Sequence, residues 1–147
     1  MALDVEKMVT ELKVLQYDFD PDATTATDIG WVDMRDYHNI LVTFFRTVGT
    51  SNLTLTILAN TASDGSGDEA TIVSKTFTAG QPNAVGDYVF LEALASQVAQ
   101  QGSEDGKAYR YVSANCTFAT GTDEGVVSYI LKPRYPRADL SADYIST

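Results

Sequence analysis

Alternation of hydrophobic and polar residues with a period of two recurs along most of the chain. Segment 52–58 is the clearest case, because Leu53, Leu55 and Ile57 fall on one face of a strand and Thr54 and Thr56 fall on the other. Further segments share this alternation or are rich in β-branched and aromatic residues: 13–19, 28–34, 39–46, 69–77, 108–118 and 125–131. The pattern predicts an all-β (mainly β) fold with about seven to eight short strands.

Turn residues between these segments predict how the strands connect. The Gly- and Ser-rich stretch 60–68 would join its flanking strands into a hairpin with a long tip. Residues 121–125 would join the last two strands as an antiparallel hairpin. The nearly continuous apolar run 39–46 predicts a strand that is buried on both faces, and Pro133 would end the pairing of the final strand.

One segment has helical spacing. Phe90, Leu91, Leu94 and Val98 would share one face of a short helix at about 90–100, which Gly102 could end. The start of this helix is open, because residues 88–90 could instead finish a strand. Strands with one helix in a crossover indicate a β-sandwich or a jelly-roll-like fold with extended termini.

The chain divides into three predicted parts. Residues 1–16 form an N-terminal arm or short helix, residues 17–132 a single β-sandwich domain, and residues 133–147 an extended C-terminal tail. The length of 147 residues and the apolar fraction of 44% suit one folded domain. Two prolines in the tail oppose helix and central strand.

The termini carry apolar side chains that are costly to leave in water, so we expect them to dock either on their own domain or on a neighbouring subunit. The candidate interface residues are Leu3, Met8, Leu12, Arg134, Tyr135, Arg137, Leu140, Tyr144 and Ile145.

Charge and hydropathy exclude some partners. The net charge is −10 and the ten Lys and Arg residues are scattered, whereas nucleic-acid binding needs a basic footprint. The first 16 residues hold no signal-like apolar stretch, and no apolar run approaches the roughly 18–20 residues that span a bilayer. We therefore expect synthesis in the cytoplasm, with neither a nucleic acid nor a membrane as partner.

Candidate catalytic and metal-ligating residues are few. The only histidine, His38, lies in a predicted turn before a strand, without a recognisable nucleophile motif beside it. The only cysteine, Cys116, lies in a predicted strand and is interpreted as a small buried hydrophobe. One histidine and one cysteine cannot supply a structural zinc site. No catalytic residue, metal or cofactor is expected.

Acidic residues cluster in three places. Asp18, Asp20 and Asp22 alternate like ligands of a hard cation, and loop 64–69 is also acidic, but neither follows a calcium-loop pattern. We interpret both as solvated turns and leave calcium binding open. The pair Asp33 and Asp36 could suggest a glycosidase, although such proximity is common among twenty acidic residues.

The aromatic residues allow two interpretations. Trp31 and seven tyrosines could form a sugar-binding platform or a protein interface, but tyrosine is also common on half-buried strand faces, which is the simpler reading. The seven are Tyr37, Tyr88, Tyr109, Tyr111, Tyr129, Tyr135 and Tyr144. Tyr135 and Tyr144 are the exceptions, because they lie in the tail, where an interface role fits better.

Two stretches of the chain resemble a known family. The run 28–37 (DIGWVDMRDY), the apolar strand after it, and Gly49 and Thr50 before a Thr/Leu strand resemble small virion proteins of tailed bacteriophages. Segments 109–113 (YRYVS) and 127–131 (VSYIL), with the exit 134–137 (RYPR), are similar to the same group. The resemblance spans about residues 28–137, and it is greatest to capsid decoration, or cement, proteins.

The resemblance implies a non-enzymatic structural protein on the outer capsid surface of a virion. Such proteins are often β-rich homotrimers that clamp neighbouring copies of the major capsid protein, with a terminal arm reaching a neighbour. The expected partners are therefore the major capsid protein and the chain itself. Alternative functions are a tail-tube, head–tail or baseplate component of the virion, and a jelly-roll carbohydrate-binding module.

Overall fold

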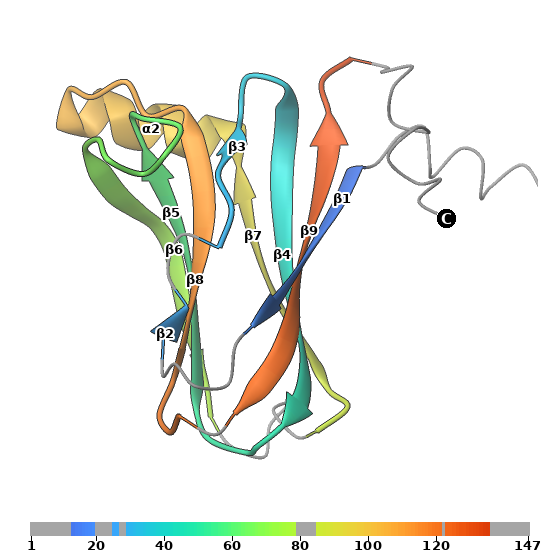
Figure 1. The fold of residues 1–147 in the computed structure, drawn as a ribbon. Coiled ribbons are helices and arrows are strands. Elements are labelled where there is room, and N and C mark those ends of the chain that lie inside the picture. The colour runs from blue at the N-terminus through green and yellow to red at the C-terminus, as the bar shows by residue number, and fades with distance from the viewer. Residues whose placement is uncertain (1–12, 20–24, 27–28, 79–84, 122, 136–147) are drawn as a thin grey trace, which may run out of the picture.

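The computed structural model describes residues 13–19, 25–26, 29–78, 85–121 and 123–135. Nine strands and one helix follow each other along this part of the chain (Figure 1). They are β1 (Lys13–Phe19), β2 (Thr25–Ala26), β3 (Val32–Asp33), β4 (Tyr37–Val48), β5 (Leu53–Asn60), β6 (Glu69–Phe77), β7 (Tyr88–Leu94), α2 (Ala95–Asp105), β8 (Tyr111–Phe118) and β9 (Glu124–Pro133).

The strands form two antiparallel sheets that face each other. One sheet, here the β4 sheet, has the order β1-β9-β4-β7. The other, here the β5 sheet, has the order β2-β8-β5-β6, and β3 also pairs with β8. Apart from the neighbours β2–β3 and β5–β6, consecutive strands alternate between the sheets, which is the double Greek key of a jelly roll. The predicted fold class is confirmed.

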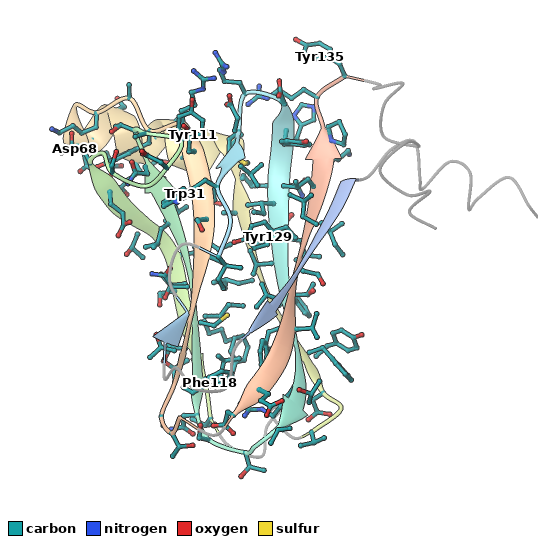
Figure 2. The ribbon with its side chains drawn as sticks, in the orientation of Figure 1. Trp31, Asp68, Tyr111, Phe118, Tyr129 and Tyr135 are labelled. Carbon is teal, nitrogen blue, oxygen red and sulfur yellow. The ribbon has the colours of Figure 1, made fainter. Side chains whose placement is uncertain are left out.

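The core lies between the sheets and follows from the period-two pattern. Leu53, Leu55 and Ile57 of β5 are fully buried, as the sequence predicts. Tyr129 of β9 also points between the sheets (Figure 2), and its hydroxyl accepts a hydrogen bond from the Ala114 N–H of β8 at 2.9 Å. This contact satisfies a buried hydroxyl and links the two layers.

Strand β4 differs from its prediction. Its residues Ile40, Val42 and Phe44 are buried, but the alternate residues Leu41, Thr43 and Phe45 are only partly covered. The strand is central, between β9 and β7, but only one of its faces lies in the core. The prediction of burial on both faces is therefore wrong.

The predicted helix is also misplaced. Residues Tyr88–Leu94 form β7, which pairs with β4, and the helix runs from Ala95 to Asp105. The helix passes through Gly102, where a Cβ atom would lie 2.5 Å from the Lys107 carbonyl oxygen, and it ends at Gly106 with φ of +65°. Pairing with a neighbouring strand overrode a spacing that is compatible with both structures.

Two further connections need correction, and two are confirmed. β8 and β9 do not form a hairpin, because β8 pairs within the β5 sheet and β9 within the β4 sheet. The strand predicted at 28–34 is reduced to β3, Val32–Asp33. β1 has its predicted bounds, and β5 and β6 form the predicted hairpin. No helix in the described part of the chain is long and apolar enough to cross a bilayer.

The division of the chain into arm, domain and tail stays a prediction. β1 begins at Lys13 and β9 runs to Pro133, so both sheet-forming segments extend slightly beyond the predicted domain limits.

Candidate functional site

The outer face of the β4 sheet carries exposed large apolar side chains along its edge strand β7. Tyr88 and Phe90 are 65% and 66% exposed, and Leu94 is 43% exposed. Phe45 of the adjacent β4 packs against Tyr88, with ring centroids 4.7 Å apart. We call Phe45, Tyr88, Phe90 and Leu94 the β7 apolar face.

The pairing register of β4 with β7 and β9 places further apolar side chains next to this face. Phe45 lies opposite Tyr88 on one side and Val126 on the other, and Leu41 lies opposite Ile130. Val126, Leu41 and Ile130 are each partly exposed. An apolar row therefore runs from Tyr88 of β7 across Phe45 of β4 to Val126 of β9. In the row that contains Phe90, the residues of β4 and β9 are polar, Thr43 and Ser128. Glu92 is the one charged side chain in the outward row of β7, and it accepts a hydrogen bond from Asn39 at 2.6 Å.

The outer face of the β5 sheet has the opposite character. Thr54 pairs with Thr76, and Thr56 with Ser74, through hydroxyl–hydroxyl hydrogen bonds of 2.8 Å. Cross-strand hydroxyl pairs of this kind satisfy each other and leave a polar surface. β6, the edge of this sheet, also exposes Lys75, a charge that discourages edge-to-edge pairing. β7, one of the two edge strands of the β4 sheet, contains no lysine or arginine.

A second surface feature lies at one end of the sandwich. A cavity of about 340 Å³ opens between α2, the β3–β4 turn, the α2–β8 link and the end of β9. Its lining consists of Met34, Arg35, Ala95, Val98, Ala99, Ala108, Tyr109, Arg110 and Arg134. We call it the arginine-rimmed cavity.

Asp33 organises two of these arginines. Its carboxylate pairs with Arg35 Nη2 at 2.9 Å, and it also accepts hydrogen bonds from Arg110 through Nε and Nη2. The guanidinium of Arg110 lies over the Tyr111 ring, 4.9 Å from the centroid. Both carboxylate oxygens are thus occupied by cations, an arrangement suited to positioning arginines rather than to glycoside hydrolysis.

The other sequence candidates lie apart from each other. His38 is exposed within β4, at an irregularity in the pairing with β9, rather than in a turn before the strand. Cys116 is buried as predicted, and burial raises the pKa of its thiol to about 12. Within the described residues, no three His, Cys, Asp or Glu side chains gather as metal ligands.

The acidic loop 64–69 has local partners. Asp64 accepts hydrogen bonds from the Ser66 hydroxyl and N–H, which lower the pKa of its carboxyl. Asp68 pairs with Lys107 at 2.9 Å. The side chains of Asp18, Asp20 and Asp22 lie outside the described residues.

The predicted interface residues are described only in part. Arg134 lines the arginine-rimmed cavity, and its Nε donates to the Tyr37 carbonyl at 3.0 Å. Tyr135 is 75% exposed and projects beyond the end of β9 (Figure 2). The remaining candidates lie outside the described residues: Leu3, Met8, Leu12, Arg137, Leu140, Tyr144 and Ile145.

Sequence reasoning missed the β7 apolar face, although a signal was present. Tyr88, Phe90 and Leu94 alternate with the buried Val89, Leu91 and Ala93 over the whole strand. With a period of two, the same residues give a strand that has apolar side chains on both faces, one buried and one exposed. Trp31, by contrast, is partly buried and covered by Gly65, where a Cβ atom would lie 2.8 Å from its Nε1.

Comparison with known proteins gives likeness at low identity. No family model matches the chain, and no curated protein matches it. Among solved structures, the SPBc2 prophage-derived protein YomS is 10% identical with a TM-score of 0.42, covering 82% of this chain and 95% of its own. A carbohydrate-binding module of the family 9 glycoside hydrolase Cel9A from Ruminococcus flavefaciens FD-1 is 7% identical with a TM-score of 0.42, covering 85% and 99%.

A third likeness is to a viral shell. A chain of the T13 particle of infectious bursal disease virus is 11% identical to this chain, with a TM-score of 0.39. The match covers 87% of this chain and 31% of the viral chain. Likenesses at this identity and TM-score assign neither a family nor a function.

Proposed function

We propose that this chain is a non-enzymatic structural protein of a bacteriophage virion, which decorates the outer capsid surface and stabilises it by clamping neighbouring major capsid proteins. The observation that carries the proposal is the β7 apolar face. Contiguous exposed apolar surface on a folded domain marks a site of protein association, and aromatic residues are enriched at such sites. The sequence resemblance to decoration proteins supports the identity of the partner.

The edge position of β7 supports self-association as well. An unprotected edge strand can pair with another chain, and a closed ring of copies covers every edge that it uses. A homotrimer would bury the β7 apolar face of each copy. Many copies of a modest interface would then hold a capsid through avidity.

Light scattering coupled to size exclusion tests the proposal. We expect the wild-type chain to have three times the 15.9 kDa mass of one copy, and to bind expanded capsids of the phage that encodes it. A Tyr88→Lys/Phe90→Lys variant should lose self-association and at least about tenfold in capsid affinity, since it places two charges in a buried apolar contact.

The matched control is Thr54→Lys/Thr56→Lys, which adds the same charge to the outer face of the β5 sheet. It should associate and bind like the wild type. A wild-type chain that neither associates nor binds capsids would contradict the proposal. A hexamer or open polymer would favour the tail-tube alternative, and a monomer whose tryptophan fluorescence responds to a glycan would favour the carbohydrate-binding module.

A further inference from the structure

The arginine-rimmed cavity combines an apolar interior with a cationic edge. Met34, Val98 and Ala95 are 3%, 2% and 9% exposed, so the interior is built of well-packed apolar side chains. The volume of about 340 Å³ falls within the roughly 300–1,000 Å³ typical of ligand pockets. The elements that form it meet at the upper end of the sandwich in Figure 1.

The charged side chains that line the cavity are all cationic. The lining holds three arginines and no acidic side chain, in a chain of net charge −10. Asp33, just behind the lining, neutralises one of the three positive charges. Two further carboxylates lie nearby, on Asp36 in the β3–β4 turn and on Asp105, which accepts a hydrogen bond from Tyr109 at 3.1 Å.

Arg134 is the arginine best placed to receive an anion. Its Nε donates to the Tyr37 carbonyl, and its backbone N–H donates to the Asp36 carbonyl at 2.8 Å, so the side chain is anchored at its base. Among the described residues, none accepts a hydrogen bond from its terminal nitrogens. A guanidinium held in this way presents a planar pair of donors that matches a carboxylate.

The chemistry that fits is therefore a carboxylate next to an apolar side chain. Residues 138–145 of this chain (ADLSADYI) supply it twice, as Asp139 beside Leu140 and Asp143 beside Tyr144. We infer that the arginine-rimmed cavity receives residues 138–145 of a second copy of the chain, with an apolar side chain inside the cavity and an aspartate at the arginines. This inference rests on the self-association clause of the proposed function.

The tail is long enough to reach a second copy, and the proposed self-association would bring one within reach. Ile145 lies ten positions after Tyr135, which corresponds to at most about 33–36 Å of extended chain. That length is similar to the width of a domain of this size, whose radius of gyration is about 15 Å. Arg134, which precedes the tail, lines the chain's own cavity. Passing residues 138–145 to the next copy would give a head-to-tail contact, which forms a ring when the rotation between copies closes.

Peptide binding tests the cavity independently of assembly. The receptor is the full chain with Asp139→Asn/Asp143→Asn, which keeps its own segment from competing, and the probe is a fluorescein-labelled peptide of residues 138–145. We expect saturable binding by fluorescence anisotropy. Replacing both aspartates of the peptide by asparagine should weaken binding at least about tenfold, because each charge-assisted hydrogen bond is lost.

Two receptor variants locate the binding. Arg134→Gln removes a cation, and Ala99→Trp fills the cavity from an exposed position on α2. Each should weaken binding at least about tenfold, whereas Lys75→Gln, a matched loss of charge on β6, should leave it unchanged. Thermal unfolding of each variant confirms that it is folded. Absence of binding, or binding that neither cavity variant weakens, would overturn the inference.

Octanoate, a carboxylate on an apolar chain, tests whether the cavity binds free carboxylic acids instead of the peptide. Binding of octanoate at the cavity without binding of the peptide would also overturn the inference, because it would make the cavity a site for free carboxylic acids. Peptide binding by a chain that stays monomeric on capsids and in solution would contradict the proposed self-association and the second-copy assignment, while the cavity would keep its peptide chemistry.

Discussion

The two ends of the sandwich both join arginine to aspartate, but with opposite exposure to solvent. At the lower end in Figure 1, Arg46 of β4 pairs with Asp123 of the β8–β9 link at 2.9 Å, and each side chain is 1% exposed. At the upper end, Asp33 is 22% exposed and its partners Arg35 and Arg110 are 64% and 34% exposed.

The two ion-pair clusters differ in their contacts as well as in their burial. Arg46 donates to the Ser51 carbonyl at 2.9 Å, and Asp123 accepts from the Ser51 and Thr120 hydroxyls. These contacts tie the β4–β5 link to the β8–β9 link, two of the connections that cross between the sheets. The upper cluster, Asp33 with Arg35 and Arg110, is more exposed to solvent. Arg134 lines the same cavity and is available to an incoming anion. Arg46 and Asp123 thus form a buried ion pair that holds the fold, whereas Asp33 and its two arginines form exposed ion pairs beside the cavity.

Asp123→Ala should produce the largest effect on stability. Removing one partner of a buried ion pair leaves the other charge uncompensated, which typically costs about 3–5 kcal/mol. Urea denaturation should show this loss as a lower midpoint with an unchanged slope. A loss below about 1 kcal/mol would show that water compensates Arg46 and that the lower end is not sealed.

The buried pair of Arg46 and Asp123 should also make the stability of the protein depend on pH. Burial alone would raise the pKa of Asp123, but the hydrogen bonds from Ser51 and Thr120 and the charge of Arg46 outweigh it and lower this pKa. A carboxyl with a lowered folded-state pKa stabilises the fold above its unfolded pKa of about 3.9, and this contribution disappears as pH falls through the folded pKa. The unfolding free energy of the wild type should therefore fall below about pH 4.

Asp123→Asn is the control for this pH dependence. It keeps the shape of the side chain but removes its titration, so stability should change less steeply with pH below about 4 than in the wild type. Equal slopes in the two proteins would assign the acid sensitivity to other carboxyls.

Asp33→Ala should have a smaller effect on stability than Asp123→Ala. Solvent already screens Arg35 and Arg110, and surface ion pairs contribute little to folding. The change should be visible instead in binding, because the cavity gains a net positive charge and should hold the Asp139/Asp143 peptide at least as tightly. An unfolding loss as large as that of Asp123→Ala would place the upper cluster among the structural contacts.

Local pattern was sufficient for much of the β structure. In β5 the inward Leu53, Leu55 and Ile57 and the outward threonines specify both the strand and its face. β7 was harder, because Phe90, Leu91 and Leu94 fit a helix as well as a strand, and only the neighbouring β4 resolves the choice. The β8–β9 connection failed for a related reason, since a short loop between two strands does not reveal which sheet each strand joins.

The two candidate surfaces, the β7 apolar face and the arginine-rimmed cavity, depend on contacts between distant parts of the chain. The cavity draws residues from 34–35, 95–99, 108–110 and 134, and no local spacing brings these four segments together. Arg134 is one of the interface candidates predicted from the sequence, whereas Arg35 and Arg110, which line the same cavity, are not among them. The run 28–37 carried the family resemblance, and its role in setting Asp33 against two arginines emerges only from the packing.

The smallest expected effect concerns Cys116, which lies in β8 between the two ends. Its thiol is fully buried and its pKa is raised to about 12, so at pH 8 almost none of it is the nucleophilic thiolate. A thiol reagent such as 5,5′-dithiobis(2-nitrobenzoic acid) should leave the native wild type unlabelled and label it fully in urea. Asp123→Ala should label faster than Asp33→Ala, because labelling reports opening of the core and the lower end holds it closed. Rapid labelling of the native wild type would show that the sheets separate readily and that neither end seals the sandwich.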